Sequence, residues 1–177
     1  MTIDSRAVQL EAMSSIAAEP RLLIVWHSRT GAAEAMARAA ADGAGPRGQL
    51  VPAADADAAL LLRAGGYLFA CPENLATMTG LMKEMFDRAY YPLLGRIEGR
   101  PYATLIAAGS DGSGAQRQID RIATGWRLRR VAEPMIARLG ADTPEAIAAP
   151  KRVPSDMLQQ CRDMGAALAE GLRIGVF

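Results

Sequence analysis

The sequence has only two cysteines, Cys71 and Cys161, and a single histidine, His27. Two cysteines cannot form the disulfide network that holds small secreted domains together. No Cys-x-x-Cys or His-Glu-x-x-His motif is present, and with one histidine no zinc site is expected. These absences favour a cytoplasmic protein without a bound metal.

Long apolar runs and an excess of one charge are also missing. No run approaches the roughly 20 apolar residues that cross a bilayer, and Asp4, Arg6 and Glu11 occupy the region where a signal peptide needs an apolar segment. The formal net charge is +1 and no sustained basic stripe is present, which argues against nucleic acid as the main partner. We therefore expect a soluble protein with neither membrane nor nucleic acid as a partner.

What the sequence has instead is enough apolar material for one substantial core, since half of its 177 residues are hydrophobic. We expect one domain over residues 21–177, preceded by an N-terminal helical extension over residues 1–20. On a helix there, Val8, Ala12 and Ile16 fall along one side. That side packs either on the domain itself or on a second subunit.

The domain opens with a strand, a turn and a helix. Residues 22–26 form an unbroken apolar run, which is typical of a parallel strand buried on both faces. The alanine-rich residues 32–41 favour a helix. Between them, Ser28, Arg29 and Thr30 precede the positive end of a helix dipole, a combination that attracts an anion such as phosphate. The alternative is that Ser28 or Thr30 only caps the helix.

Further strands and helices alternate along the rest of the chain. The remaining strands are predicted at residues 49–51, 66–70 and 102–108, and at 131–136 as an edge strand interrupted by Glu133-Pro134; helices are predicted at 55–63, 79–92, 115–126 and from 155 onward. Pro72 is expected to end the third strand, and residues 142–154 are expected to form a loop. This alternation predicts an α/β fold, a doubly wound five-stranded parallel sheet of order 2-1-3-4-5.

Three polar or glycine-rich segments follow strands that this topology places side by side. They are Ser28–Gly31, Pro72–Asn74 and Gly109–Gly114, after the first, third and fourth strands. Ligands of doubly wound sheets bind outside the carboxyl ends of the strands, at the point where the strand order reverses. The sequence therefore predicts a binding site at this rim.

These segments resemble the flavodoxin-like FMN-binding family, and within it the small NAD(P)H-dependent flavin and quinone reductases. The likeness is carried by residues 27–31, 71–80 and 109–114 and extends from about Arg21 to about Ile136. It implies that the first loop holds the FMN phosphate and that the other two flank the isoalloxazine. The cofactor-binding residues so implied are Ser28, Arg29, Thr30, Gly31, Ala33, Pro72, Glu73, Asn74, Leu75, Met78, Gly109, Ser110 and Asp111. Two departures are Ala33, where the family often has a third hydroxyl, and Leu75, where an aromatic residue is expected.

The resemblance further implies an FMN-dependent oxidoreductase that passes electrons from NAD(P)H as co-substrate to a quinone, flavin or similar small acceptor. No catalytic side chain is assigned, because the flavin carries the chemistry. One alternative is a flavodoxin-type electron carrier, although the net charge of +1 lacks the acidity that such docking uses. Another is a flavin-free binding module on the same fold. The implied assembly is a homodimer or homotetramer, with Tyr90, Tyr91 and Trp126 as candidate interface or lid residues.

Three smaller hypotheses concern single residues. Cys71 and His27 lie near one rim and are candidates for a nucleophilic pair, whereas buried cysteines are usually inert. Glu73 lies either beside the flavin ring or in solvent at a turn. The segment 127–130, with three arginines, either binds the extra phosphate of NADPH or forms a solvated basic edge.

Overall fold

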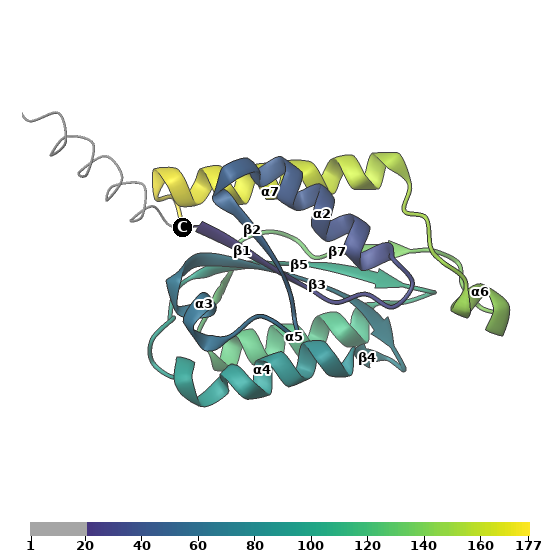
Figure 1. Cartoon of the computed structure of the whole chain (residues 1–177), viewed down its shortest axis with the longest axis horizontal. Coiled ribbons are helices and arrows are strands. Elements are labelled where there is room, and N and C mark those ends of the chain that lie inside the picture. The colour runs from purple at the N-terminus through teal and green to yellow at the C-terminus, as the bar shows by residue number, and fades with distance from the viewer. Residues whose placement is uncertain (1–20) are drawn as a thin grey trace, which may run out of the picture.

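The computed structural model describes residues 21–177, so the extension predicted over residues 1–20 lies outside the described residues. The strands are β1 (Arg21–Trp26), β2 (Gly48–Pro52), β3 (Ala64–Asn74), β4 (Thr77–Met78), β5 (Pro101–Ala108), β6 (Arg129–Arg130) and β7 (Met135–Arg138). The helices are α2 (Ala32–Ala44), α3 (Ala58–Arg63), α4 (Gly80–Leu93), α5 (Ser113–Gly125), α6 (Pro144–Ala148) and α7 (Ser155–Ile174). Figure 1 shows a central sheet with α2 and α7 on one face and α3, α4 and α5 on the other.

The sheet has the strand order β2-β1-β3-β5-β6, and these strands are parallel. With β5 as the fourth strand, this confirms the predicted order 2-1-3-4-5. The fifth position is divided, because β6 pairs with the start of β5 and β7 pairs with its end. Glu133-Pro134 lies between the two pieces, where the missing proline N–H prevents continuous pairing.

Strand β3 is longer than predicted, and the expectation that Pro72 ends it was wrong. Pro72 stays in register with Ala107 of β5. The carbonyl of Ala70 accepts a hydrogen bond from the N–H of His27, so the backbone polar groups of Ala70 point toward β1. Backbone orientation repeats every second residue, so the nitrogen of Pro72 points toward β1 as well. Because the β1 pairing ends at Trp26 and Ala70, the missing N–H of Pro72 leaves no ladder partner unpaired. The strand then turns back through β4, a short antiparallel partner that the sequence did not predict.

Apolar layers lie on both faces of the sheet. One is centred on Tyr67, Phe69 and Phe86 under α4 and α5, and the other joins the sheet to α2 and α7. In the second layer, glycine lets α2 and α7 pack closely side by side: a Cβ on Gly43 would lie 1.9 Å from the carbonyl oxygen of Arg162, and one on Gly165 would lie 1.9 Å from that of Ala40. The face of α4 turned to the first layer carries the buried Met82, Met85, Phe86 and Ala89, whereas Leu81 is exposed.

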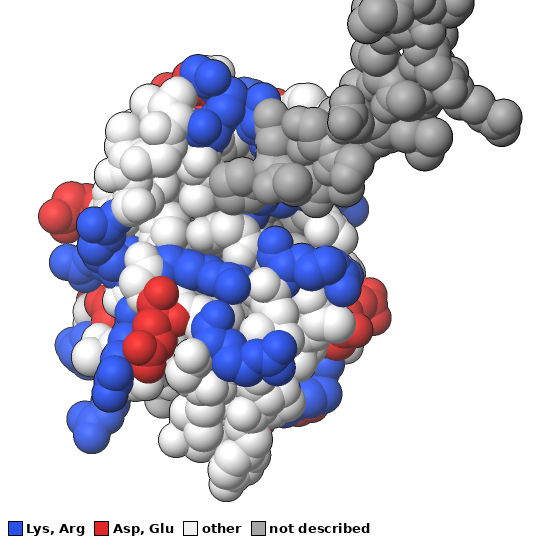
Figure 2. Space-filling model, turned by 90° about the vertical axis from the view of Figure 1, so that its left-hand side faces the viewer, with Lys and Arg blue, Asp and Glu red and all other residues white. Residues whose placement is uncertain are grey.

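Arginines gather at the end of the molecule where the strands begin. Arg21 opens β1, Arg63 ends α3, Arg96 follows α4, and Arg127 and Arg129 lie at the start of the fifth strand position, all of them exposed. Figure 2 shows the blue side chains spread over this end. The near-neutral net charge therefore conceals a basic end, remote from the rim at which the strands finish. No helix within residues 21–177 combines the length and apolarity needed to cross a bilayer.

Candidate functional site

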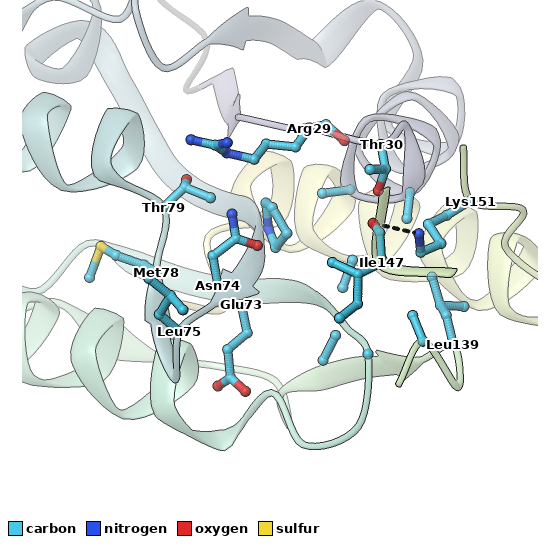
Figure 3. A pocket seen from close by; sticks show the side chains of 18 of the residues that line it. Arg29, Thr30, Glu73, Asn74, Leu75, Met78, Thr79, Leu139, Ile147 and Lys151 are labelled. Carbon is cyan, nitrogen blue, oxygen red and sulfur yellow. Dashed lines mark hydrogen bonds between the residues drawn. The ribbon is translucent and has the colours of Figure 1, made fainter. Parts of the chain in front are cut away.

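A cavity of about 840 Å³ opens at the carboxyl ends of β1, β3 and β5. Its walls are the loop from β1 into α2, the β3–β4 hairpin, the loop after β5, and a segment from Leu139 to Lys151 that follows β7. Figure 3 shows side chains from these walls arranged around the cavity. The rim predicted from the topology is therefore hollow.

The loop after β1 delivers the first turn of α2 to the cavity without a side-chain cap. The N-cap residue is Gly31, whose φ of 91° suits glycine, and no side chain accepts a hydrogen bond at this cap. The hydroxyl oxygen of Ser28 accepts instead from the N–H of Gly31 (3.1 Å). Ala32 and Ala33 both line the cavity and are buried. The alternative in which Ser28 or Thr30 caps the helix was therefore wrong. The first-turn N–H groups of α2 have no partner within the helix.

The β3–β4 hairpin forms the opposite wall with a strained turn. Asn74 pairs with Thr77, so Leu75 and Ala76 alone make the turn. Their φ angles are 52° and 58°, as in the type I′ turns that normally select asparagine and glycine. The Leu75 side chain is 98% exposed at the tip. The hairpin thus holds an apolar side chain out over the cavity rim on a backbone that alanine and leucine rarely adopt.

Glu73, on β3, caps the N-terminus of helix α5, which is distant in sequence. Its Oε1 accepts from the N–H of Gly112 (2.8 Å) and its Oε2 from the N–H of Ala115 (2.9 Å). In Figure 3 its carboxylate points away from Arg29 and Thr30. This cap satisfies first-turn donors of α5 and favours its dipole. Glu73 is therefore not a solvated turn residue; it also lines the cavity, and its place beside a flavin ring stays a prediction.

His27 and Cys71 do not form a reactive pair. His27 Nδ1 lies 2.9 Å from the hydroxyl of Thr79, and burial, aided by the charge of Arg29, lowers the pKa of the imidazole below its ordinary value. Cys71 is fully buried, and burial raises the pKa of its thiol to about 12. A thiol that stays protonated at neutral pH is packing material rather than a nucleophile. Within residues 21–177, no group of three His, Cys, Asp or Glu residues could hold a metal ion.

The segment after β7 is the wall that the sequence did not predict. It contains helix α6, whose N-cap Thr143 accepts from the N–H of Ala146 (3.2 Å). Lys151 follows, and its backbone N–H donates to the carbonyl of Thr30 (2.7 Å), which ties this segment to the loop before α2. The segment 142–154, predicted to be a loop, therefore contains a short helix. Its signal was a threonine cap followed by Pro144 and Glu145, residues that favour a helix start.

No protein-family model matches the chain, and no curated protein matches it in sequence. Solved structures do match it. A flavodoxin, WrbA-like protein from Agrobacterium tumefaciens has a TM-score of 0.71 at 18% identity, covering 88% of this chain and 98% of its own. The Megasphaera elsdenii flavodoxin has a TM-score of 0.64 at 17% identity over 84% and 98%. A flavodiiron core from Synechocystis has 0.72 at 14% identity, over 97% of this chain but 40% of its own. The fold is flavodoxin-like.

On this flavodoxin-like fold, the predicted binding residues come together. All of them line the cavity except Gly31 and Asp111. Gly31 instead forms the cap of α2, and Asp111 accepts from the Ser113 hydroxyl outside the cavity. The lining residues that sequence reasoning missed are Ala32, Ala76, Thr77, Thr79, Gly80, Ala107, Ala108, Leu139, Ala141, Ile147, Ala148 and Lys151. The first seven lie within two residues of a predicted residue in sequence, but the last five come from the segment after β7.

Other candidates lie away from the cavity. Arg129 and Arg130 pair with Pro101 and Tyr102 at the start of β5, about 20 Å along the strand from its cavity end at the usual strand rise. Arg127, Arg129 and Arg130 thus form an exposed basic edge away from the cavity, and the hypothesis that they bind the extra phosphate of NADPH stays a prediction. Trp126 is buried in the core, so it is neither interface nor lid.

Proposed function

We propose that this chain binds FMN in the cavity and acts as an oxidoreductase, passing electrons from NAD(P)H to a quinone, flavin or similar small acceptor. The observation that carries the proposal is the first turn of α2, which meets one end of an 840 Å³ cavity with no side-chain cap. Helix N-termini of this kind bind phosphate through backbone N–H groups. The likeness to flavodoxins, at under a quarter identity, supports the fold on which the site is built.

The residues present fit the two parts of the cofactor. At the α2 end, Ser28 and Thr30 offer hydroxyls, and the small side chain of Ala33 leaves room for a phosphate. At the hairpin end, Asn74 and Leu75 line a wall suited to a flat ring. The chemistry that FMN supplies when bound is the transfer of a hydride from the donor and of electrons to the acceptor.

The protein groups would position the reactants and exclude water. Asn74 offers an amide that can hydrogen-bond the edge of the flavin ring. The exposed side chain of Leu75, at the tip of the hairpin, would cover an apolar face of the ring. Arg29 is exposed at the mouth of the cavity, where its charge attracts the pyrophosphate of NAD(P)H. Because hydride transfer needs no dedicated acid or base, no catalytic side chain is proposed.

An absorption spectrum of the purified chain tests this function. The protein is titrated with FMN in the dark, the bound fraction is read from quenching of flavin fluorescence, and NADH or NADPH is then added without oxygen. A yellow protein bleached by either nucleotide supports the reductase. A yellow protein that neither nucleotide bleaches supports a flavodoxin-type electron carrier, and a colourless protein that FMN cannot turn yellow supports a flavin-free binding module.

A matched pair of variants locates the site. Thr30→Glu places a carboxylate at the α2 end of the cavity and is expected to abolish FMN binding by charge repulsion. Thr124→Glu makes the same change on the exposed far end of α5 and should leave binding unchanged. Equal affinity in both variants would place the flavin elsewhere on the protein.

The proposed assembly is a homodimer or homotetramer. Tyr90 and Tyr91 on α4 are 43% and 80% exposed and stack edge to face with ring centroids 5.0 Å apart, which makes them the candidate contact. Light scattering on the full chain, with Tyr91→Glu as the disrupting variant, measures the assembly directly. An unchanged mass for Tyr91→Glu would remove this residue from the contact.

A further inference from the structure

The charged groups around the cavity are few, and one of them is already engaged. Among the described residues that line it, Arg29, Glu73 and Lys151 carry charge. The carboxylate of Glu73 is held by two backbone N–H groups of the α5 cap. The charges left to act on a ligand are therefore two cations, and they belong to different walls.

These two cations lie at opposite ends of the cavity. Figure 3 shows the Arg29 side chain extending toward Thr79 and Asn74, away from Thr30. The amide oxygen of Asn74, oriented to satisfy both of its polar atoms, accepts from Arg29 Nε at 3.3 Å. Although Arg29 belongs to the loop before α2, its guanidinium thus faces the hairpin end.

Lys151 lies at the other end, beside the loop before α2. Its N–H donates to the carbonyl of Thr30 at 2.7 Å, and Figure 3 shows its side chain next to Thr30 and Ile147. Its ammonium donates to the carbonyl oxygens of Ala146, Ile147 (3.0 Å) and Ala149 (2.6 Å), which close helix α6. Neutral carbonyl oxygens orient an ammonium without cancelling its charge, so a fixed positive charge lies beside the start of α2.

We propose that Lys151 is the counter-charge for the phosphate of the cofactor. The sequence had suggested Arg29 for this role, because Arg29 lies in the loop before α2. This inference rests on the proposed function and names a binding residue within the same site. A phosphate monoester carries between one and two negative charges at neutral pH. The half-buried, pre-positioned ammonium of Lys151 adds Coulomb attraction where Ala33 provides no hydroxyl. The segment from Leu139 to Lys151 is then the wall that secures the phosphate end.

Comparing FMN with riboflavin isolates this contribution, because the two flavins differ only in the phosphate. Dissociation constants are measured by fluorescence quenching for the full chain and for Lys151→Met, Lys151→Arg and Arg29→Met. Lys151→Met should weaken FMN binding by about tenfold or more while riboflavin binding changes less than about twofold. Lys151→Arg should restore most of the FMN preference, and Arg29→Met should leave the ratio of the two constants as in the unmodified chain.

The outcomes separate this inference from the proposed function. Damage to α6 or to its contact with Thr30 would weaken both flavins together, so an unchanged ratio in Lys151→Met overturns the role of Lys151 while FMN binding stands. A ratio that falls in Arg29→Met instead assigns the phosphate to Arg29. If the unmodified chain binds neither flavin, the proposed function fails, and the role of Lys151 fails with it.

Discussion

Glu73, near the end of β3, accepts a hydrogen bond from the backbone N–H of Ala115 in the first turn of α5 (2.9 Å). The two residues are 42 positions apart in sequence, and their contact joins the hairpin wall of the cavity to the helix behind it. Met78 reinforces the joint from β4, since its N–H donates to the side chain of Gln118 at 2.9 Å. The shape of the cavity at the hairpin end therefore depends on α5.

Replacing Glu73 tests this joint. Glu73→Gln keeps one acceptor but turns an NH₂ group toward a backbone donor, so the free energy of unfolding should fall by about 1–3 kcal/mol. Urea unfolding followed by circular dichroism measures the loss. The control is Glu84→Gln on the exposed face of α4, where an ion pair with Arg88 at the surface is removed, and its effect should be much smaller. Equal losses in the two variants would contradict the cap.

Gly114 permits the hairpin to pack against α5. A Cβ at this position would lie 2.0 Å from the carbonyl oxygen of Ala76, so Gly114→Ala forces the hairpin tip away from the helix. We expect a loss of about 1–3 kcal/mol in the free energy of unfolding, measured by urea titration. Gly125→Ala is the matched control on the same helix, because nothing lies within 4 Å of its added methyl group. A Gly114→Ala protein as stable as that control would refute the close approach.

The turn at Leu75 and Ala76 stores strain that glycine can release. Ala76 has a φ of 58°, which costs an L-residue about 1–2 kcal/mol and glycine almost nothing. Glycine loses more conformational entropy on folding than alanine does, which offsets part of this gain. Ala76→Gly should therefore stabilise the protein by up to about 1 kcal/mol. Thermal unfolding checks the sign.

The same substitution in a helix should destabilise the protein. Ala167 is exposed in the interior of helix α7, where Ala167→Gly should cost about 0.5–1 kcal/mol. The two substitutions are chemically identical, and only the backbone conformation differs. A loss in both would show that the hairpin turn carries no strain.

The layers, the strand order and the rim of this fold follow from local patterns in the sequence. Apolar runs such as residues 22–26 and 102–108 have the length and continuity of buried parallel strands, and the topology then places the loops after them together. The predicted site residues of β1, β3 and β5 therefore reached one cavity. Arg29 reached the cavity too, but its guanidinium faces Asn74 at the hairpin end, because a sequence position does not specify where a long side chain points.

What the sequence did not reveal depends on contacts between distant residues. The turn at Leu75 and Ala76 lacks the glycine or asparagine that normally signals a hairpin, so β4 was missed. The cap on α5 comes from Glu73 rather than from a residue next to the helix. Lys151 follows α6 and reaches the cavity because its backbone N–H donates to the carbonyl of Thr30, more than a hundred residues away in sequence. No window of local sequence contains both partners of such contacts.

His27 should make the stability of the protein depend on pH. Burial, aided by Arg29, holds the pKa of its imidazole below the ordinary value of 6.5 in the folded state. The unfolded chain therefore binds a proton at a higher pH than the folded chain does, so stability is complete above pH 6.5 and is lost as the pH falls below that value. The chain has no other histidine, so one imidazole accounts for this part of the profile.

Urea titrations at about pH 7.5 and pH 5.5 measure the effect, because histidine but few carboxylates change charge between those values. The unmodified chain should lose more stability than His27→Gln, whose amide cannot be protonated but can still reach the hydroxyl of Thr79, 2.9 Å from Nδ1 in the folded protein. Proton NMR of the imidazole gives the folded-state pKa directly. A midpoint at or above 6.5, or equal losses in the two proteins, would mean that burial does not disfavour the charged ring.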